Sequence, residues 1–587
     1  MKQFSISLRA LYQQSKAQTL SYGLRSCSPM LLSRKFIFSM AKKSSTSALT
    51  KEQHTAQDKR YAEGHEYDYV IIGTGSSALT VGALLAHAGY KVCMLEAHDI
   101  PGGYCQTFRT GDFYFCAQVH YIWGCAPGGK IYEFLKHIGL EKDITFELFD
   151  KEGYDHMVMP DGKRVKIPYG WDNLVKSVTD AYPDQKEPME KFVKVLRKIR
   201  EEFRHFPDRK LTWKDYLQAY QFPTIIKYRK ATLQDLYNEV DLSKEAQAVL
   251  AANAGDFMAP PNRLSLFMYV ALFGGYNTGA YYPTKHFKYY IDRLAKFITD
   301  HDGCHIYFET PVTKINVEND RVVSVETEDG KKFAAKNFIC NGDPKKMAHI
   351  IGWDKFPATE RKKLEYEYSP AGVVIYLGLK DIDLRKFGFG SFNIWHLEDF
   401  DMNKMWEEMG KTNFTKPWIF MSTPTLHTKE GGTTPGPDNQ ILEIAMYTEY
   451  KPFKEAQERG YAEYAKLKMK TADRMLQIVE EKYIPNLRKH IVVQTVGTST
   501  TNEDFVLTPM GNAYGSNMTP EQVSLNRLKA KTPFSNFFWC NASSGWAGMY
   551  GTVSTGMSLY MDLTGDRFYT QGMNIGDDEA IKQLASR

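Results

Sequence analysis

Small residues at Gly73, Gly75 and Ala78 and an acid at Glu96 have the types and spacing that bind a dinucleotide. Gly73 permits a tight turn, Gly75 lets a pyrophosphate approach the backbone, and Ala78 lets the following helix pack closely on its strand. Glu96 lies eighteen residues after Ala78, where a carboxylate can accept both hydroxyls of the adenosine ribose. The sequence therefore predicts a site for the ADP part of a dinucleotide cofactor.

The elements that position these residues follow from the surrounding pattern. Residues 70–72 form the short apolar run that is typical of a strand covered on both faces. Ser76 and Ser77 then begin an apolar helix, whose free N–H groups point at the phosphates. A second strand over residues 91–95 delivers Glu96. Strand, turn, helix, strand and acid occur in order, which predicts a βαβ unit.

Further motifs continue this unit along the chain. They are EAHDIPGGYCQTF from Glu96, FCAQVHYIWG from Phe115, MVMPDGKRVKIPYG from Met157, GNAYG from Gly511 and TPFSNFFWCNASSGWAGMYGTVSTG from Thr532. With them, residues 67–566 resemble the flavoproteins of the phytoene desaturase, carotenoid isomerase and retinol saturase (all-trans-retinol 13,14-reductase) group. The motifs at the two ends of this range are more specific than those between them.

The resemblance implies FAD as the cofactor. It also implies an α/β fold, in which an FAD-binding Rossmann-like domain of the glutathione-reductase and amine-oxidase type is built from discontinuous segments beside an α+β substrate domain. The cofactor residues implied beyond the first turn are Ala97, Gly102, Gly103, Val312, Gly545, Gly548 and Gly551. Val312 would lie beside the adenine through its backbone, and the last three glycines would lie near the flavin ring.

The resemblance also points to titratable residues that face the substrate. His120 and Tyr121 match the segment that follows the Gly-Gly pair in this group, so we expect them to be catalytic, with Tyr282 as a weaker third choice. The chain departs from the group's pattern at Cys116, Gln118, Lys285, His286, Asn541 and Ala542. Relatives usually carry an acid and a glycine at the first two of these positions and two glycines at the next two. At the last two they usually carry a Gly-Asp or Gly-Glu pair.

The segments divide between two regions. We expect residues 66–125, 301–349 and 531–587 to form the FAD-binding domain, and residues 126–300 and 350–530 to form the substrate-binding region. Alternating apolar and polar residues over 305–330 predict paired strands with a turn at 318–320. Apolar runs predict strands at 373–379 and 441–446, and helical spacing predicts helices over 190–203 and 462–482. The many aromatic residues of the inserted segments fit either an apolar tunnel or an aromatic core.

The first sixty residues form a basic, serine-rich leader. Residues 1–51 contain nine Lys or Arg, eleven Ser and no Asp or Glu, which is typical of a transit peptide for a plastid or a mitochondrion. An unstructured basic tail, with translation starting at Met40, is the alternative. No run of apolar residues is long enough to span a bilayer.

Composition excludes several other classes of protein. The chain of 587 residues is 43% hydrophobic and 24% charged, with a formal net charge of only +5, which indicates a globular enzyme rather than a nucleic-acid binder. No metal-binding spacing of Cys or His occurs, so we expect no metal site. The segment FPTIIKYRK, from Phe222 to Lys230, mixes apolar and basic residues. It predicts either peripheral contact with a membrane or an ordinary buried helix.

These features predict an FAD-dependent oxidoreductase or isomerase that acts on carbon-carbon double bonds of a long apolar polyene, such as a carotenoid or a retinoid. A polyunsaturated fatty-acid double-bond isomerase or desaturase is an alternative in the same fold. A second alternative is not an enzyme: Rab escort and GDP-dissociation-inhibitor proteins resemble this fold and bind prenylated partners. The intact glycines and Glu96 favour the flavin-binding alternatives. The electron partner cannot be read from the sequence.

Overall fold

The computed structural model describes residues 53, 56–58, 61, 66–206, 213, 219–428, 432, 438–523, 527–570, 573 and 576–586. The predicted leader lies almost wholly outside these residues. None of the helices in this described part of the chain combines the length and the apolar character that crossing a membrane requires.

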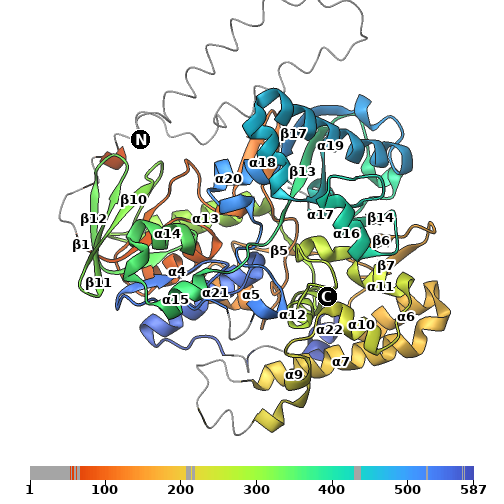
Figure 1. Ribbon diagram of the computed structural model, residues 1–587, viewed down its shortest axis with the longest axis horizontal. Helices are drawn as coiled ribbons and strands as arrows, with labels where there is room; N and C mark the ends of the chain where they lie inside the picture. Colours follow the sequence, from red (N-terminus) through yellow and green to blue (C-terminus); the bar gives the residue numbers. More distant parts are fainter. Residues whose placement is uncertain are drawn as a thin grey trace, which may run out of the picture. The chain divides into compact units, whose positions relative to one another are not determined.

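A seven-stranded sheet carries the dinucleotide turn. Its strands are β1 (Glu66–Ile72), β2 (Val92–Leu95), β9 (His305–Tyr307), β10 (Val312–Glu318), β11 (Arg321–Thr327), β12 (Lys332–Cys340) and β18 (Phe537–Trp539). β9, β2, β1, β12 and β18 pair in parallel in that order, while β10, β11 and the start of β12 form an antiparallel ribbon. Strands from three distant parts of the chain therefore form one sheet, as the red β1 beside the green β12 shows in Figure 1.

Helices cover both faces of this sheet. On β1, Tyr69 and Ile71 enter one apolar core, whereas Val70 and Ile72 enter a second core on the opposite face. On the first face, α4 (Ser76–His87) packs against α13 (His286–Thr299) and α21 (Gly548–Thr564), and on the second face lies α14 (Pro344–Ile351). Burial on both sides explains why the strand has a continuous apolar sequence.

A second seven-stranded sheet is built from the inserted segments. Its order is β17 (Ile491–Gly497), β13 (Ala371–Leu379), β16 (Gln440–Thr448), β15 (Trp418–Ser422), β14 (Asn393–Leu397), β6 (Asp155–Val158) and β7 (Arg164–Ile167). All its pairings are antiparallel except that of β14 with β6. Two ribbons complete the strands: β3 (Thr107–Thr110) with β4 (Phe113–Cys116), and β5 (Phe146–Leu148) with β8 (Tyr281–Pro283).

The remaining α-helices belong mostly to the insertions. They are α5 (Lys130–His137), α6 (Trp171–Ala181), α7 (Lys186–His205), α9 (Pro223–Tyr228), α10 (Leu233–Glu239), α11 (Lys244–Ala251), α12 (Leu266–Tyr276), α15 (Ala358–Leu364), α16 (Met402–Gly410), α17 (Pro424–His427), α18 (Tyr450–Arg459), α19 (Tyr461–Lys482), α20 (Ser499–Val506) and α22 (Asp577–Ser586). The helices predicted over 190–203 and 462–482 are confirmed as α7 and α19, and the predicted strands are confirmed as β10, β11, β13 and β16.

Two helices lie across the predicted domain limits. α13 falls in the segment expected to bind substrate, yet it packs on α4 of the FAD-binding sheet. α22 falls in the segment expected to bind FAD, yet Asp577 at its start accepts hydrogen bonds from Trp171 and Arg200 of α6 and α7. The division into two regions remains a prediction.

Candidate functional site

One continuous cavity of about 2880 Å³ unites the predicted cofactor and substrate residues. The predicted residues that line it are Gly73, Gly75, Ser76, Ser77, Glu96, Ala97, Gly102, Gly103, His120, Tyr121, Val312, Gly545, Gly548 and Gly551. Ala78 and Tyr282 do not line the cavity, and both are fully buried. Pockets for drug-sized ligands measure roughly 300–1,000 Å³, so this cavity has room for a dinucleotide and a second large ligand.

The turn after β1 has the geometry that a phosphate requires. Gly73 has φ = +93°, a conformation that glycine adopts without strain. Gly75 N–H donates to Asn341 Oδ1 over 2.9 Å, and a Cβ on Gly75 would overlap that oxygen. Gly102 N–H donates to Thr74 O over 3.1 Å, which brings the Gly-Gly pair against the turn; a Cβ on Gly103 would lie 3.3 Å from Gly75 Cα.

Glu96 lies beside the same turn. Its Oε2 accepts hydrogen bonds from Thr74 N (2.8 Å) and Thr74 Oγ1 (2.5 Å), and its Oε1 accepts one from His98 N (2.8 Å). A carboxylate has about four acceptor positions, so a ribose hydroxyl can still bind. Val312 lines the cavity at the start of β10, where only the backbone amide and carbonyl offer polar contacts.

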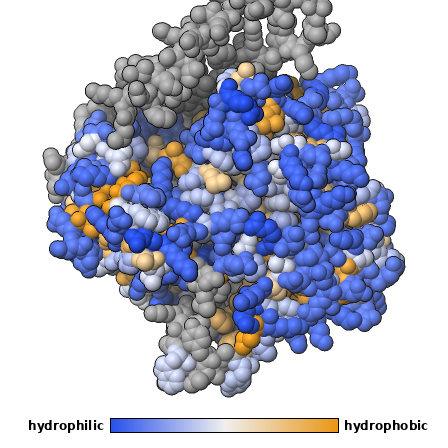
Figure 2. Space-filling model, in the orientation of Figure 1, coloured by the Kyte–Doolittle hydropathy of each residue, from blue (hydrophilic) through white to orange (hydrophobic). Residues whose placement is uncertain are grey.

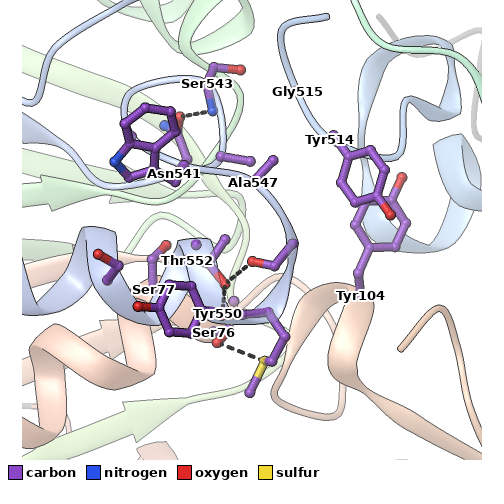
Figure 3. A pocket seen from close by; sticks show the side chains of 18 of the residues that line it. Ser76, Ser77, Tyr104, Tyr514, Gly515, Asn541, Ser543, Ala547, Tyr550 and Thr552 are labelled. Carbon is purple, nitrogen blue, oxygen red and sulfur yellow. Dashed lines mark hydrogen bonds between the residues drawn. The ribbon is translucent and has the colours of Figure 1, made fainter. Parts of the chain in front are cut away.

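The other wall of the cofactor region is the start of α21. Gly548 has φ = +72°, and a Cβ there would meet no atom within 4 Å, so the backbone borders open space. Gly551 serves close packing instead, because its Cβ would lie 2.8 Å from the Trp546 backbone. Ser76 Oγ on α4 contacts Met549 Sδ at 3.2 Å, so the two helix starts meet at the cavity (Figure 3).

The loop before α21 shows what replaces the usual acid at Asn541 and Ala542. Asn541 Oδ1 accepts from Ser543 N (3.1 Å) and Ser544 N (3.0 Å), and its Nδ2 donates to Gly342 O (3.1 Å) (Figure 3). The Asn541 amide therefore fastens the loop to the end of β12. Ala542 contributes no charge there.

A buried cation lies under this loop. Arg527 is 5% exposed, lines the cavity, and donates to Ala542 O and Gly545 O. Its Nη1 has no hydrogen-bond partner, and no described carboxylate forms an ion pair with the guanidinium. Burial lowers the pKa of Arg527 to about 10, so it is charged at neutral pH. A glycine-lined turn at a helix start, an acid for ribose and this cation fit the diphosphate and ribose of FAD.

His120 has a carboxylate partner that the sequence pattern did not single out. His120 Nδ1 lies 2.7 Å from Glu443 Oε2, and Glu443 on β16 is only 1% exposed. The imidazole packs on Phe420 at a centroid distance of 4.9 Å. The sequence signal that could have revealed this partner is the single acid within the apolar run of β16. The structure therefore places His120 in the cavity wall with one ring nitrogen held by a buried acid.

Tyr121 lies beside two further carboxyls that the sequence did not reveal. Its hydroxyl oxygen lies 2.5 Å from Asp256 Oδ2 and 3.1 Å from Asp155 Oδ2, and its ring stacks on Tyr276 at 4.1 Å. Asp256 lines the cavity, whereas Asp155 does not. The hydroxyl of Tyr121 is thus engaged with acids rather than free to contact a substrate.

The structure also places Tyr282 and His286, which the sequence analysis named. The prediction that Tyr282 faces the substrate is wrong, since the side chain is fully buried on β8 and packs on Phe287 and His427. His286, where relatives usually have glycine, has φ = +69°, so the backbone keeps the left-handed conformation that glycine favours.

Within the described residues, no group of three or more His, Cys, Asp or Glu is arranged to hold a metal ion.

The two-faced sheet, the glycine turn and the cavity together define an FAD-binding protein with a Rossmann-like fold. The sequence model of the family "Flavin containing amine oxidoreductase" matches residues 79–393, which is more than half of the chain. The chain belongs to this family and is an FAD-dependent enzyme.

Similar proteins agree with this assignment. The chain is 22% identical to all-trans-retinol 13,14-reductase of Danio rerio, over 83% of this chain and 84% of that protein. It is 24% identical to the chloroplastic prolycopene isomerase of Daucus carota, over 88% and 82% of the two chains. The solved structure of putrescine oxidase bound to putrescine has the same fold, with a TM-score of 0.57 and 14% identity, over 85% of this chain and 99% of that one.

Proposed function

We propose that this enzyme uses FAD to reduce, desaturate or isomerise carbon-carbon double bonds of a long apolar polyene of the carotenoid or retinoid class. The observation that carries this proposal is the continuity of the cavity. It runs from the dinucleotide turn, past His120, to apolar side chains of the second sheet. The names of the two relatives, a retinol reductase and a prolycopene isomerase, support the same substrate class.

The cavity wall suits a conjugated chain rather than a polar metabolite. Trp395 on β14, and Trp418 and Phe420 on β15, present aromatic surface to it, and Met258 and Met268 add adaptable apolar contacts. Such a wall excludes water from the substrate.

The chemistry divides between cofactor and protein. FAD supplies hydride transfer to or from carbon. His120 presents the ring nitrogen that Glu443 does not hold, and can form a hydrogen bond there. Glu443 fixes the orientation of the imidazole, because a buried carboxylate holds Nδ1.

We further propose that substrate enters at α9, from a membrane surface. Phe222, Ile225, Ile226 and Arg229 line the cavity, and Ile226 is 40% exposed. Apolar atoms gather at the surface where Figure 1 places α9 (Figure 2). The segment holds one short helix, and a capping box formed by Thr232 and Asp235 starts the next helix, α10, just after it. The proposal also includes import into an organelle, directed by residues 1–60.

The deciding experiment mixes photoreduced enzyme, without oxygen, with carotenoids, retinoids and polyunsaturated fatty acids. Flavin absorbance and product masses are followed together. Flavin reoxidation with a gain of two hydrogens identifies a saturase, whereas an isomer of equal mass with reduced flavin identifies an isomerase. Reaction only with fatty acids would favour the first alternative. The same mixtures with oxidised enzyme test for a desaturase, which reduces its flavin while the product loses two hydrogens; reaction with none of the three classes in either flavin state would refute the polyene proposal.

A further inference from the structure

Two carboxyls, one buried and one half-buried, meet at a single phenol beside the cavity. Asp155 begins β6 and is 0% exposed, while Asp256 ends the short 3-10 helix Ala252–Asp256 and faces the cavity. The Tyr121 oxygen lies within hydrogen-bond distance of both, at 3.1 and 2.5 Å. We call Asp155 and Asp256 the carboxyl pair and Tyr121 its tyrosine.

Proton counting shows that one carboxyl of the pair is protonated. A phenol has one O–H and can donate to only one carboxylate. The other contact therefore needs a proton on a carboxyl, which donates to the phenol oxygen. Two carboxylates this close also disfavour ionisation of both. Burial raises the pKa of Asp155 to about 7, and burial followed by the charge of Asp155 raises the pKa of Asp256 well above its usual range.

The surroundings keep this proton in place. Asn393, opposite Asp155 in the pairing of β14 with β6, donates to Asp155 Oδ1 over 3.2 Å. The Trp395 indole lies in the cavity wall and is 2% exposed. It faces the Asp155 carboxyl, but its N–H is not in hydrogen-bonding geometry. The other titratable neighbours of the pair are Tyr154, Tyr169, Tyr276 and Tyr514. No described Lys, Arg or His offsets the charge of either acid.

We propose that Asp256 is the proton donor to a substrate carbon, and that Asp155 and Tyr121 position its carboxyl. The inference rests on the proposed function. Asp256 gives its proton to one carbon of a double bond, while the other carbon receives the hydride that reduced FAD supplies. The π bond is replaced by two C–H bonds, the two electrons come from FAD, and the Asp256 carboxylate then regains a proton from solvent. Desaturation runs the same steps in reverse.

The first test needs no turnover. Infrared spectra of the oxidised holoenzyme, in H₂O and D₂O at about pH 8, should show the carbonyl stretch of a protonated carboxyl. Asp256→Asn should abolish this band and Asp155→Asn should retain it. The control is Asp343→Asn, which should retain the band. Asp343 also accepts a hydrogen bond from a tyrosine, Tyr368 (2.8 Å), but the nearby charge of Lys345 favours the ionised form of its carboxyl. A wild-type spectrum without the band, or a band that survives Asp256→Asn, would overturn the assignment.

The second test uses the reaction. Asp256→Asn should bind a reactive polyene with unchanged affinity, measured by fluorescence quenching of the oxidised enzyme, yet form product about 100-fold or more slowly. Tyr121→Phe should shift the pH profile of the rate toward higher pH, because the hydrogen bond from Tyr121 lowers the pKa of Asp256; a merely structural role would not shift the profile. If the wild-type enzyme transforms no polyene, the proposed function fails while the infrared band still tests Asp256. If wild type and Asp256→Asn react equally fast, only the proton-donor proposal fails.

Discussion

Replacing Gly75 with alanine tests the close approach at the dinucleotide turn. A Cβ there would overlap Asn341 Oδ1 and lie 3.3 Å from Asn341 Cγ. Gly75 has φ = −60°, so alanine adds no backbone strain and the effect comes from the clash alone. Asn341 cannot move freely, because its Nδ2 donates to Ser77 Oγ (2.9 Å) and Cys540 O (2.7 Å).

The magnitude follows from the bonds that displacement of Asn341 would break. Three hydrogen bonds are lost, counting the one from Gly75 N–H. At about 1 kcal/mol net each, the free energy of unfolding should fall by about 3 kcal/mol. These bonds join the start of α4 to the ends of β12 and β18, so the variant should also retain less FAD.

Urea denaturation and the ratio of flavin to protein absorbance measure the two effects. Gly497→Ala is the matched control, because a Cβ there meets only Tyr376 at an ordinary 3.7 Å; it should change neither quantity. In an Asn341→Ala background the clash is absent, so Gly75→Ala should then cost less than about 0.5 kcal/mol, a clear departure from additivity. Equal losses in both backgrounds would refute the steric explanation.

Three further predictions concern other parts of the chain. First, burial raises the pKa of Asp155 to about 7 and the pKa of Asp256 well above its usual range, whereas an unfolded aspartate has a pKa of about 3.9. Stability should therefore fall as pH rises from about 4 to 7, by up to about 1.4 kcal/mol per pH unit for each of the two groups; Asp155→Asn should remove the share of Asp155 from this slope in urea titrations, and an unchanged slope would contradict the assignment. Second, Arg527→Met should weaken FAD binding about 10- to 100-fold in fluorescence titrations but leave riboflavin binding unchanged, because riboflavin has no phosphate; equal weakening of both would indicate a loop defect instead. Third, residues 1–60 fused to a fluorescent reporter should direct it to an organelle, and a diffuse cytosolic signal would count against the leader proposal.

The cofactor fold was predictable because its signals are local. The turn at Gly73 and Gly75 and the acid at Glu96 fall within one strand-helix-strand unit, where the chain itself sets the spacing. Their residue types carry the information, since only small residues fit the turn and only an acid accepts the ribose hydroxyls. The substrate-region elements β13, β16 and α19 were predictable for the same reason, because each is a single continuous pattern.

The groups around His120 and Tyr121 were decided by the tertiary structure alone. Glu443 is 323 residues from His120, and Asp155 and Asp256 are 34 and 135 residues from Tyr121. No periodicity in the sequence connects such positions. They meet because β16 and β6 belong to one sheet whose pairing order the chain reveals only when folded. Burial then does what residue type cannot, because it raises the pKa of both aspartates above the usual range.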